Sequence, residues 1–471
     1  MKKIHLISAA MLLASCAVGP DYERPKVEVP AAYKESSPAL GWKPAEPRDL
    51  APRGNWWAMF GEPELDALMA KVDAANQSVA AAEAQVRISA ALADQARAGF
   101  WPTVGATVSA NESQPSRTTG PVIGQASTRR TIYALPVNVS WEADLWGRVR
   151  RQVEAGEAGT RASASDLVNA RLAAQAALAQ NYFGLRALDS QKKLLEATVA
   201  AYAKNLELTR NRYAAGVVSR VDIAQAETQL NAARAQMLDV GVQRAQLEHA
   251  IAVLTGAPAP AFALGAGELP AAPPPVPAAG VPADLLERRP DVAAAERRVE
   301  AANAQIGVAK AAWFPAATLT GVYGFQTANN SLWFTAPSNF WSLGAALALT
   351  IFDGGRRAAV SDQALAGYDQ TVANYRGTVL TAFAEVEDNL AALRILEAEQ
   401  AVQDETVRAA QQSLDIIQNQ YKAGIANFLQ VAISQTALLN AQTTALAIRA
   451  RRITASVLLV KALGGGWDQK P

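Results

Sequence analysis

The sequence has few of the residues that build metal sites and nucleophilic centres. Its 471 residues include one cysteine and two histidines, too few for a zinc site and little for covalent catalysis. Lysine plus arginine (44) nearly equals aspartate plus glutamate (43), so no basic field for nucleic acid is expected. These absences favour a protein that is not an enzyme, needs no cofactor or metal, and does not bind nucleic acid.

Long apolar runs are also missing. The most prominent one, residues 4–14, follows two lysines and is too short for a membrane-spanning helix, but it has the length of a signal-peptide core. It ends in Leu13-Ala14-Ser15-Cys16, which resembles a bacterial lipobox. We therefore expect removal of residues 1–15 and attachment of a diacylglycerol to Cys16. An ordinary signal peptide with an incidental cysteine is the alternative.

The chain contains two similar halves. Residues 79–83 and 292–296 both read Val-Ala-Ala-Ala-Glu, an offset of 213 positions, and the pair Gly147-Arg148 recurs at an offset of 208 as Gly355-Arg356. A period this long is far above that of solenoid repeats. The sequence therefore predicts a single internal duplication.

Each half predicts a helix, a strand pair, a long helix, a turn and a second helix. Residues 148–213 and 356–421 each form a proline-free stretch of 66 residues, which would give helices about 99 Å long. Shorter helices are expected over residues 63–99 and 221–254. Heptad spacing of apolar residues predicts coiled coils. The first long seam is Leu195, Val199, Tyr202, Leu206 and Tyr213, and the second is Val407, Ala410, Leu414, Ile417 and Tyr421.

Between these helices the apolar period changes to two. Residues 133–141 and 341–351 alternate apolar with small or polar side chains, and each is expected to pair with a strand near 103–111 or 317–326. Four such strands cannot close a membrane barrel, whereas a trimer would supply twelve and leave room for water. A half-buried sheet in a soluble domain is the alternative.

The remaining motifs match a known family. Residues 282–291 read Pro-Ala-Asp-Leu-Leu-Glu-Arg-Arg-Pro-Asp, and residues 140–148 read Ser-Trp-Glu-Ala-Asp-Leu-Trp-Gly-Arg. The chain resembles the TolC-like outer membrane factors of bacterial tripartite efflux systems, in their lipoprotein (NodT/OprM-like) branch. The resemblance implies a mainly α protein with a small β part. It would form a trimeric 12-stranded outer-membrane β-barrel, four strands per chain, continued by a long periplasmic α-helical coiled-coil barrel.

The resemblance also implies partners and a location. The partners would be two further copies in a homotrimer, a periplasmic adaptor protein, an inner-membrane pump and outer membrane lipid. The protein would lie in the outer membrane, lipid-anchored, and extend into the periplasm. Its function would be that of a passive conduit, gated at its periplasmic tip. A non-conducting structural or adhesive coiled-coil lipoprotein is the alternative, although such a strut would need no strand pairs.

The expected domain organisation follows the duplication. It consists of a signal peptide 1–15, an N-terminal equatorial segment 16–61, a first structural repeat 62–255, a proline-rich equatorial linker 256–283, a second structural repeat 284–463 and a C-terminal tail 464–471. At the start of the second repeat we expect Asp284 to be a helix N-cap. Arg288 and Arg289 should pair with nearby acids.

The candidate gate lies at the helix turns farthest from the strands. Gly216 and Gly424 follow the long helices and are expected to end them in the left-handed conformation. The family resemblance implies that a leucine ring closes this tip, and Leu429 matches that position. The acidic position of many family members is Ile433 here, which favours an apolar plug of both residues over an acidic ring.

Two further gate residues follow from the same resemblance. Tyr421 and Lys422 match positions that tie neighbouring helices together in the family. Asp222, on the first hairpin, is a plausible partner for Lys422. Ordinary coiled-coil packing and capping is the alternative role for all of these residues.

Overall fold

The computed structural model describes residues 17–35, 54–114, 116, 129–274 and 282–465. The predicted lipidation site, Cys16, lies outside these residues. The chain forms two compact units. Unit 1 comprises Met1–Lys26, Val86–Ser163 and Ala295–Tyr375, and unit 2 comprises Val27–Gln85, Ala164–Ala294 and Arg376–Pro471.

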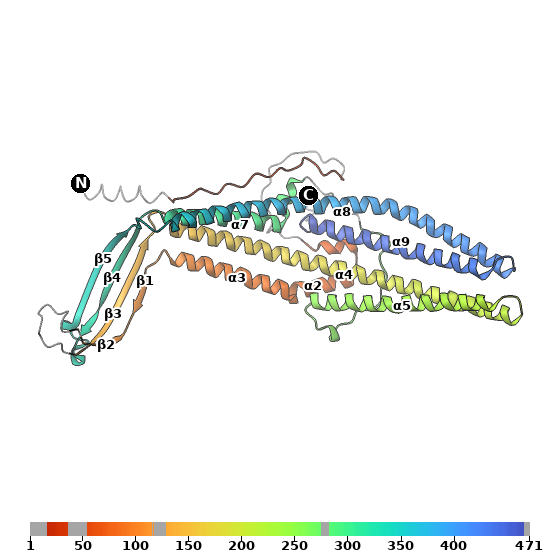
Figure 1. Cartoon of the computed structure of the whole chain (residues 1–471), viewed down its shortest axis with the longest axis horizontal. Coiled ribbons are helices and arrows are strands. Elements are labelled where there is room, and N and C mark those ends of the chain that lie inside the picture. Colours follow the sequence, from red (N-terminus) through yellow and green to blue (C-terminus); the bar gives the residue numbers. More distant parts are fainter. Residues whose placement is uncertain (1–16, 36–53, 115, 117–128, 275–281, 466–471) are drawn as a thin grey trace. The chain divides into compact units, whose positions relative to one another are not determined.

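The two halves of the chain share one order of elements, labelled in Figure 1. The first half consists of α2 (Pro63–Ala75), α3 (Gln77–Ala98), β1 (Thr103–Ala106), β2 (Ser109–Ser113), β3 (Arg130–Ala143), α4 (Arg148–Ala214) and α5 (Arg220–Leu254). The second consists of α6 (Ala283–Arg288), α7 (Pro290–Ala311), β4 (Ala316–Thr327), β5 (Asn339–Ala348), α8 (Arg356–Lys422) and α9 (Phe428–Ala462). Short 3₁₀ turns include η1 (Trp56–Phe60).

The long helices begin and end at glycines. Helices α4 and α8 have 67 residues each, so each is about 100 Å long. Gly147 (φ 80°) and Gly355 (φ 90°) precede them, and Gly216 (φ 74°) and Gly424 (φ 81°) follow them. All four adopt the left-handed conformation that only glycine reaches at little cost, and the predicted C-terminal caps are confirmed. Among the described residues, no helix is both long enough and apolar enough to cross a membrane.

The helix expected over residues 63–99 is interrupted, and that prediction is wrong. Asn76 is extended (ψ 122°) and separates α2 from α3. Its side-chain oxygen accepts hydrogen bonds from the backbone N–H groups of Ser78 (3.0 Å) and Val79 (3.1 Å), as an N-cap does. Its amide nitrogen donates to the carbonyl of Leu254 at 2.8 Å. The break therefore joins the ends of three helices.

The start of the second repeat also differs in detail. Asp284 is not the N-cap of α6, because that position is Pro282 and Asp284 lies in the first turn. Arg289 separates α6 from α7 and pairs with acids as predicted. It donates two bonds to Asp291 (2.6 and 3.0 Å) and one to Glu385 (2.6 Å).

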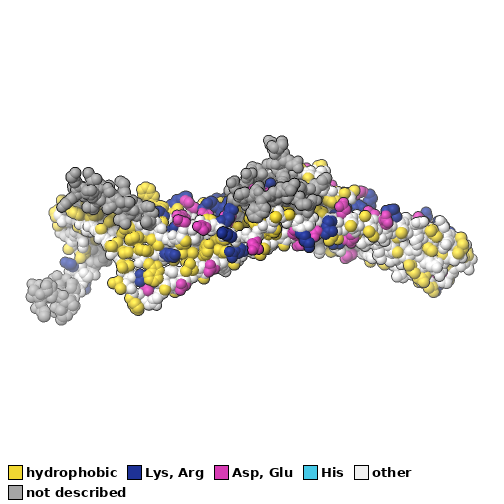
Figure 2. All heavy atoms as spheres, turned by 90° about the horizontal axis from the view of Figure 1, so that it is seen from above, with side chains coloured by type: hydrophobic (Ala, Val, Ile, Leu, Met, Phe, Trp, Pro, Cys, Tyr) yellow, Lys and Arg dark blue, Asp and Glu magenta, His cyan; other side chains and the backbone are white. Residues whose placement is uncertain are grey.

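The strands of unit 1 form one antiparallel sheet in the order β1-β3-β4-β5, with β2 also paired to β3. Strands β1 and β2 are two segments of the single predicted partner, so four strand positions remain. Strand β5 ends at Ala348, and the expectation that it continues to Ile351 is wrong. One face is apolar and exposed, with Leu343 80% and Leu347 67% accessible. Figure 2 shows hydrophobic side chains gathered over the strands and adjoining helix ends.

Unit 2 contains the main apolar core. Residues of η1, α2, α4, α5 and α9 pack together, and the largest buried side chains include Leu65, Met69, Leu178, Tyr182, Phe183 and Ile251. Burial of apolar surface contributes about 25 cal/mol per Å² to stability, so this cluster stabilises the unit. It packs the middle of α4 against α2, α5 and α9.

Candidate functional site

The hairpin α4–α5 packs on the hairpin α8–α9 near their turns (Figure 1). The buried cluster there includes Tyr202 and Leu206 of α4, Leu230 of α5, Leu414 of α8 and Phe428 of α9. The predicted heptad seams supply most of the long-helix members. This cluster is the apolar base on which the candidate gate residues lie.

Tyr421 is the best-connected of the predicted gate residues. Its side chain is 4% exposed, and the guanidinium carbon of Arg212 lies 4.5 Å from its ring centroid. Arg212 also donates a hydrogen bond to the Tyr421 backbone carbonyl. The hydroxyls of Thr209 and Tyr421 are 3.2 Å apart. We call Thr209, Arg212 and Tyr421 the latch, because these three residues tie α4 to α8.

Asp222 and Lys422 are separate in the single chain. The carboxylate of Asp222 accepts a hydrogen bond from the backbone N–H of Ser219 at 2.9 Å and completes a capping box at the start of α5. Lys422 is the last, exposed residue of α8. Within the part of the chain that the structure describes, no ion pair joins the two side chains.

Leu429 and Ile433 lie on one exposed face of α9. Their exposed fractions are 49% and 60%, whereas the neighbouring Phe428 and Val431 are buried at 1% each. Residues four apart share a helix face, so both side chains point away from the cluster that covers their neighbours. The structure thus leaves both residues of the predicted apolar plug available to another surface.

A second polar centre in unit 2 was not predicted. The Asp189 side chain is 4% exposed and binds two arginines, Arg186 at 2.9 Å and Arg244 at 2.7 Å. Arg186 also pairs with Glu64 of α2 and stacks on Tyr182. Burial raises the pKa of Tyr182 to about 12. This charge network joins α2, α4 and α5.

The same network holds the linker that follows α5. Arg186 donates to the carbonyl of Gly265 (2.7 Å), and Arg244 donates to that of Leu264 (2.7 Å). The N–H of Gly267 in turn donates to Asp189 at 3.0 Å. A Cβ atom at Gly267 would lie 2.8 Å from the Arg186 guanidinium. This part of the predicted equatorial linker is therefore fixed to the helices by buried charges.

The residues that follow Cys16 form a strap along α7 in unit 1. The N–H of Val18 donates to the carbonyl of Trp146 at 3.0 Å, and a Cβ atom on Gly19 would lie 2.6 Å from the Cα of Gly307. Further bonds come from side chains on α4 and α7. They are Asn303 to the Pro20 carbonyl, Arg151 to Asp21, and Tyr22 and Arg24 to Glu296.

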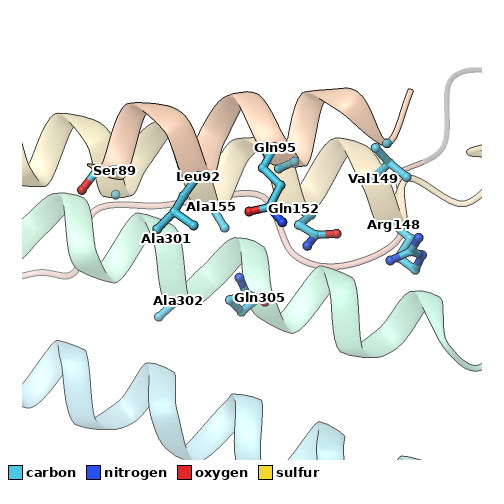
Figure 3. A pocket seen from close by; sticks show the side chains of 14 residues that line it. Ser89, Leu92, Gln95, Arg148, Val149, Gln152, Ala155, Ala301, Ala302 and Gln305 are labelled. Carbon is cyan, nitrogen blue, oxygen red and sulfur yellow. The ribbon is translucent and has the colours of Figure 1, made fainter. Parts of the chain in front are cut away.

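An open groove of about 580 Å³ lies between α3, α4 and α7 of unit 1 (Figure 3). Gln95, Gln152 and Gln305 contribute amide groups from the three helices, and most other lining residues are small. Arg148 is the one charged residue that lines it. These side chains include no acid, histidine or cysteine. Among the described residues, no cluster of histidine, cysteine and acidic side chains could hold a metal.

Comparison with known proteins agrees with this architecture. Residues 68–257 and 281–465 match the family described as outer membrane efflux protein. The chain is 31% identical to the pyoverdine export outer membrane protein OpmQ of Pseudomonas aeruginosa, covering 99% of this chain and 98% of OpmQ. It is also 31% identical to the toluene efflux pump outer membrane protein TtgC of Pseudomonas putida, covering 99% and 96%. The solved outer-membrane channel OprN superposes with a TM-score of 0.87 at 28% identity, covering 96% of this chain and all of that one.

The chain belongs to the outer membrane efflux protein family. It is an outer-membrane channel of an efflux system that extends into the periplasm. The predicted fold class, a trimeric channel that is mainly α with a small β part, is confirmed by its solved relatives. The non-conducting lipoprotein predicted as the alternative receives no support from these relatives.

Proposed function

We propose that the protein is a passive conduit that closes at the turns of its hairpins. A periplasmic adaptor opens it, and an inner-membrane pump drives transport. The observation that carries this proposal is the latch, in which Arg212 and Thr209 of one hairpin hold Tyr421 of the other. A tie made by a few polar contacts can be broken by a partner at modest cost. The latch can therefore be released without unfolding the helices.

The closed state is proposed to be apolar. In a homotrimer, Leu429 and Ile433 would each supply three side chains to a constriction, and an apolar constriction excludes ions by dewetting. A pair between Lys422 and Asp222 of neighbouring copies would add only about 0 to 1 kcal/mol as an exposed ion pair. Asp222 is also already engaged in its capping box. We therefore assign closure to the leucine and isoleucine, with Lys422 in a minor role.

Leu429→Ser is expected to raise single-channel conductance in lipid bilayers, because a hydroxyl hydrates the constriction. Leu238→Ser serves as the control, since Leu238 is 70% exposed on α5 but lies away from the turn. Leu438→Ser, two and a half turns further along α9 and 8% exposed, should mainly cost packing. A folded trimeric Leu429→Ser variant with wild-type conductance would exclude this constriction.

The protein is further proposed to be anchored by lipid on Cys16. Support comes from the strap, which holds Val18 beside Trp146 at the junction of strand β3 and helix α4. Val18 follows the proposed lipid acceptor by two positions in the sequence. Two or three acyl chains anchor a protein durably, whereas one does so marginally.

Cys16→Ser is expected to abolish palmitate labelling and to weaken membrane attachment before assembly. The fold should persist, because the strap, helices and strands make their contacts without the thiol. Labelling with radioactive palmitate and circular dichroism of the purified variant would test the two parts separately. Continued labelling of the variant would show that another residue accepts the lipid.

The cargo of this channel is proposed to be set by the pump. Two relatives of equal identity are named for different compounds, pyoverdine and toluene. The groove in unit 1 is lined mainly by amide and small side chains, with Arg148 alone charged, which gives little basis for strong selection by charge. We therefore propose small organic molecules as the cargo class.

A further inference from the structure

The two hairpins differ in how well their polar groups are satisfied. Near its turn, the first hairpin has three side-chain atoms that are buried and have no hydrogen-bond partner within the described residues. They are the hydroxyl of Tyr202, the amide nitrogen of Asn205 and the amide oxygen of Gln225. At the corresponding positions of the second hairpin, 208 residues later, the chain has Ala410, Ser413 and Ile433. Gln400 of α8 and Arg452 of α9 also have such an atom, but farther from their turn. Among the described residues near the two turns, the unsatisfied groups thus lie on the hairpin α4–α5.

Tyr202 is the clearest of the three. Its side chain is 5% exposed and packs among Leu206, Leu230 and Leu414. Burial raises the pKa of the Tyr202 hydroxyl, so the hydroxyl stays protonated. It can donate a hydrogen bond, but its apolar neighbours have no acceptor to receive one. While the hairpins are packed together, another copy of the chain cannot supply a hydrogen-bond partner, because atoms of the same chain cover the Tyr202 hydroxyl oxygen.

A buried polar group without a partner loses its hydrogen bonds to water and gains none in exchange. Separation of the two hairpins would let the Tyr202 hydroxyl form hydrogen bonds with water. The same packing is held together by the latch, where Thr209 and Tyr421 do satisfy each other at 3.2 Å. The hydrogen-bonded Thr209 and the unsatisfied Tyr202 therefore lie about two turns apart on α4. The first favours packing of the hairpins and the second opposes it.

We propose that the unsatisfied groups of Tyr202, Asn205 and Gln225 are a built-in bias of the tip hairpins toward separation, and that the latch opposes it. This inference rests on the proposed gate, since separation of the hairpins is the opening step. Its consequence is that the closed tip is less favoured than the apolar cluster and the latch alone would make it. A partner that breaks the latch then needs to supply less further energy to open the channel.

Tyr202→Phe tests the bias, because phenylalanine keeps the ring and removes only the hydroxyl. We expect slower hydrogen–deuterium exchange of the backbone amides in the last turns of α4 in the detergent-solubilised trimer, because these turns lose their helical hydrogen bonds more readily once the hairpins have separated. The expected slowing is about tenfold, within the range for relief of one buried unsatisfied group. The midpoint of thermal unfolding should not fall.

Tyr213→Phe is the matched control. Tyr213 lies on the same helix but is 45% exposed, so its hydroxyl can already form hydrogen bonds with water. Amide exchange in Tyr213→Phe should therefore stay at the wild-type rate. Unchanged or faster exchange in Tyr202→Phe would overturn the proposed bias. Exchange is measured without any current, so this outcome is separate from the conductance of Leu429→Ser, which tests the gate itself.

Discussion

Replacement of Asp189 by alanine is expected to lower the free energy of unfolding by about 3 kcal/mol, the size of effect seen when one partner of a buried ion pair is removed. Asp189 is the carboxylate shared by Arg186 and Arg244. Without it, both guanidinium groups keep only one acidic partner each, Glu64 and Glu248. The Arg186 side chain is 3% exposed, so water cannot replace the lost carboxylate.

Thermal or denaturant unfolding of the purified protein measures this effect. Lys193→Ala is the matched control, because Lys193 also joins α4 to the linker through Glu268 but both side chains are exposed. It should leave the unfolding midpoint unchanged. Asp189→Asn should fall between alanine and the wild type, since an amide oxygen still accepts hydrogen bonds. Equal midpoints for Asp189→Ala and the wild type would show that the network adds no net stability.

Arg212→Ala should favour the open channel about 30-fold, which corresponds to about 2 kcal/mol for the combined loss of one cation–π contact and one charge-assisted hydrogen bond. Both contacts are made to Tyr421, to its ring and to its carbonyl. The variant leaves the apolar cluster intact, because the guanidinium lies at its edge. The ratio of open to closed time in single-channel recordings gives the effect directly.

Arg210→Ala separates this effect from a general loss of charge. Arg210 lies two residues earlier on α4 and forms an exposed ion pair with Glu227, which is expected to contribute little. Arg212→Lys should resemble alanine more than the wild type, because an ammonium cannot stack as a planar guanidinium does. If Arg210→Ala opened the channel as much as Arg212→Ala, the latch would not be the closing contact.

The sequence predicts the long elements well for a simple reason. Helices α4 and α8 are bounded by glycines whose left-handed conformation ends or begins a helix regardless of tertiary context. The break at Asn76 has no such local signal. A single asparagine is tolerated inside a helix, and it becomes an N-cap here because its amide also reaches the carbonyl of Leu254, a contact that only folding creates.

The candidate site was likewise predictable from the sequence only in part. Tyr421 could be found because a heptad position and a family position coincide on it. Arg212 and Thr209 could not, since heptad patterns record only apolar positions and give no information about polar side chains that reach from α4 to α8. Asp189 was missed for a related reason, because an aspartate flanked by ordinary helical sequence looks solvated until α5 and the linker cover it.

Matched helix lengths limit how this protein can be lengthened or shortened. Helices α4 and α8 both have 67 residues, and α5 and α9 both have 35. Seven residues inserted into one hairpin arm alone would shift its turn by about 10 Å along the partner helix and separate Arg212 from Tyr421. A working change must therefore add or remove whole heptads in all four helices together. Adapting the conduit to a wider periplasm thus requires coordinated insertions rather than single ones.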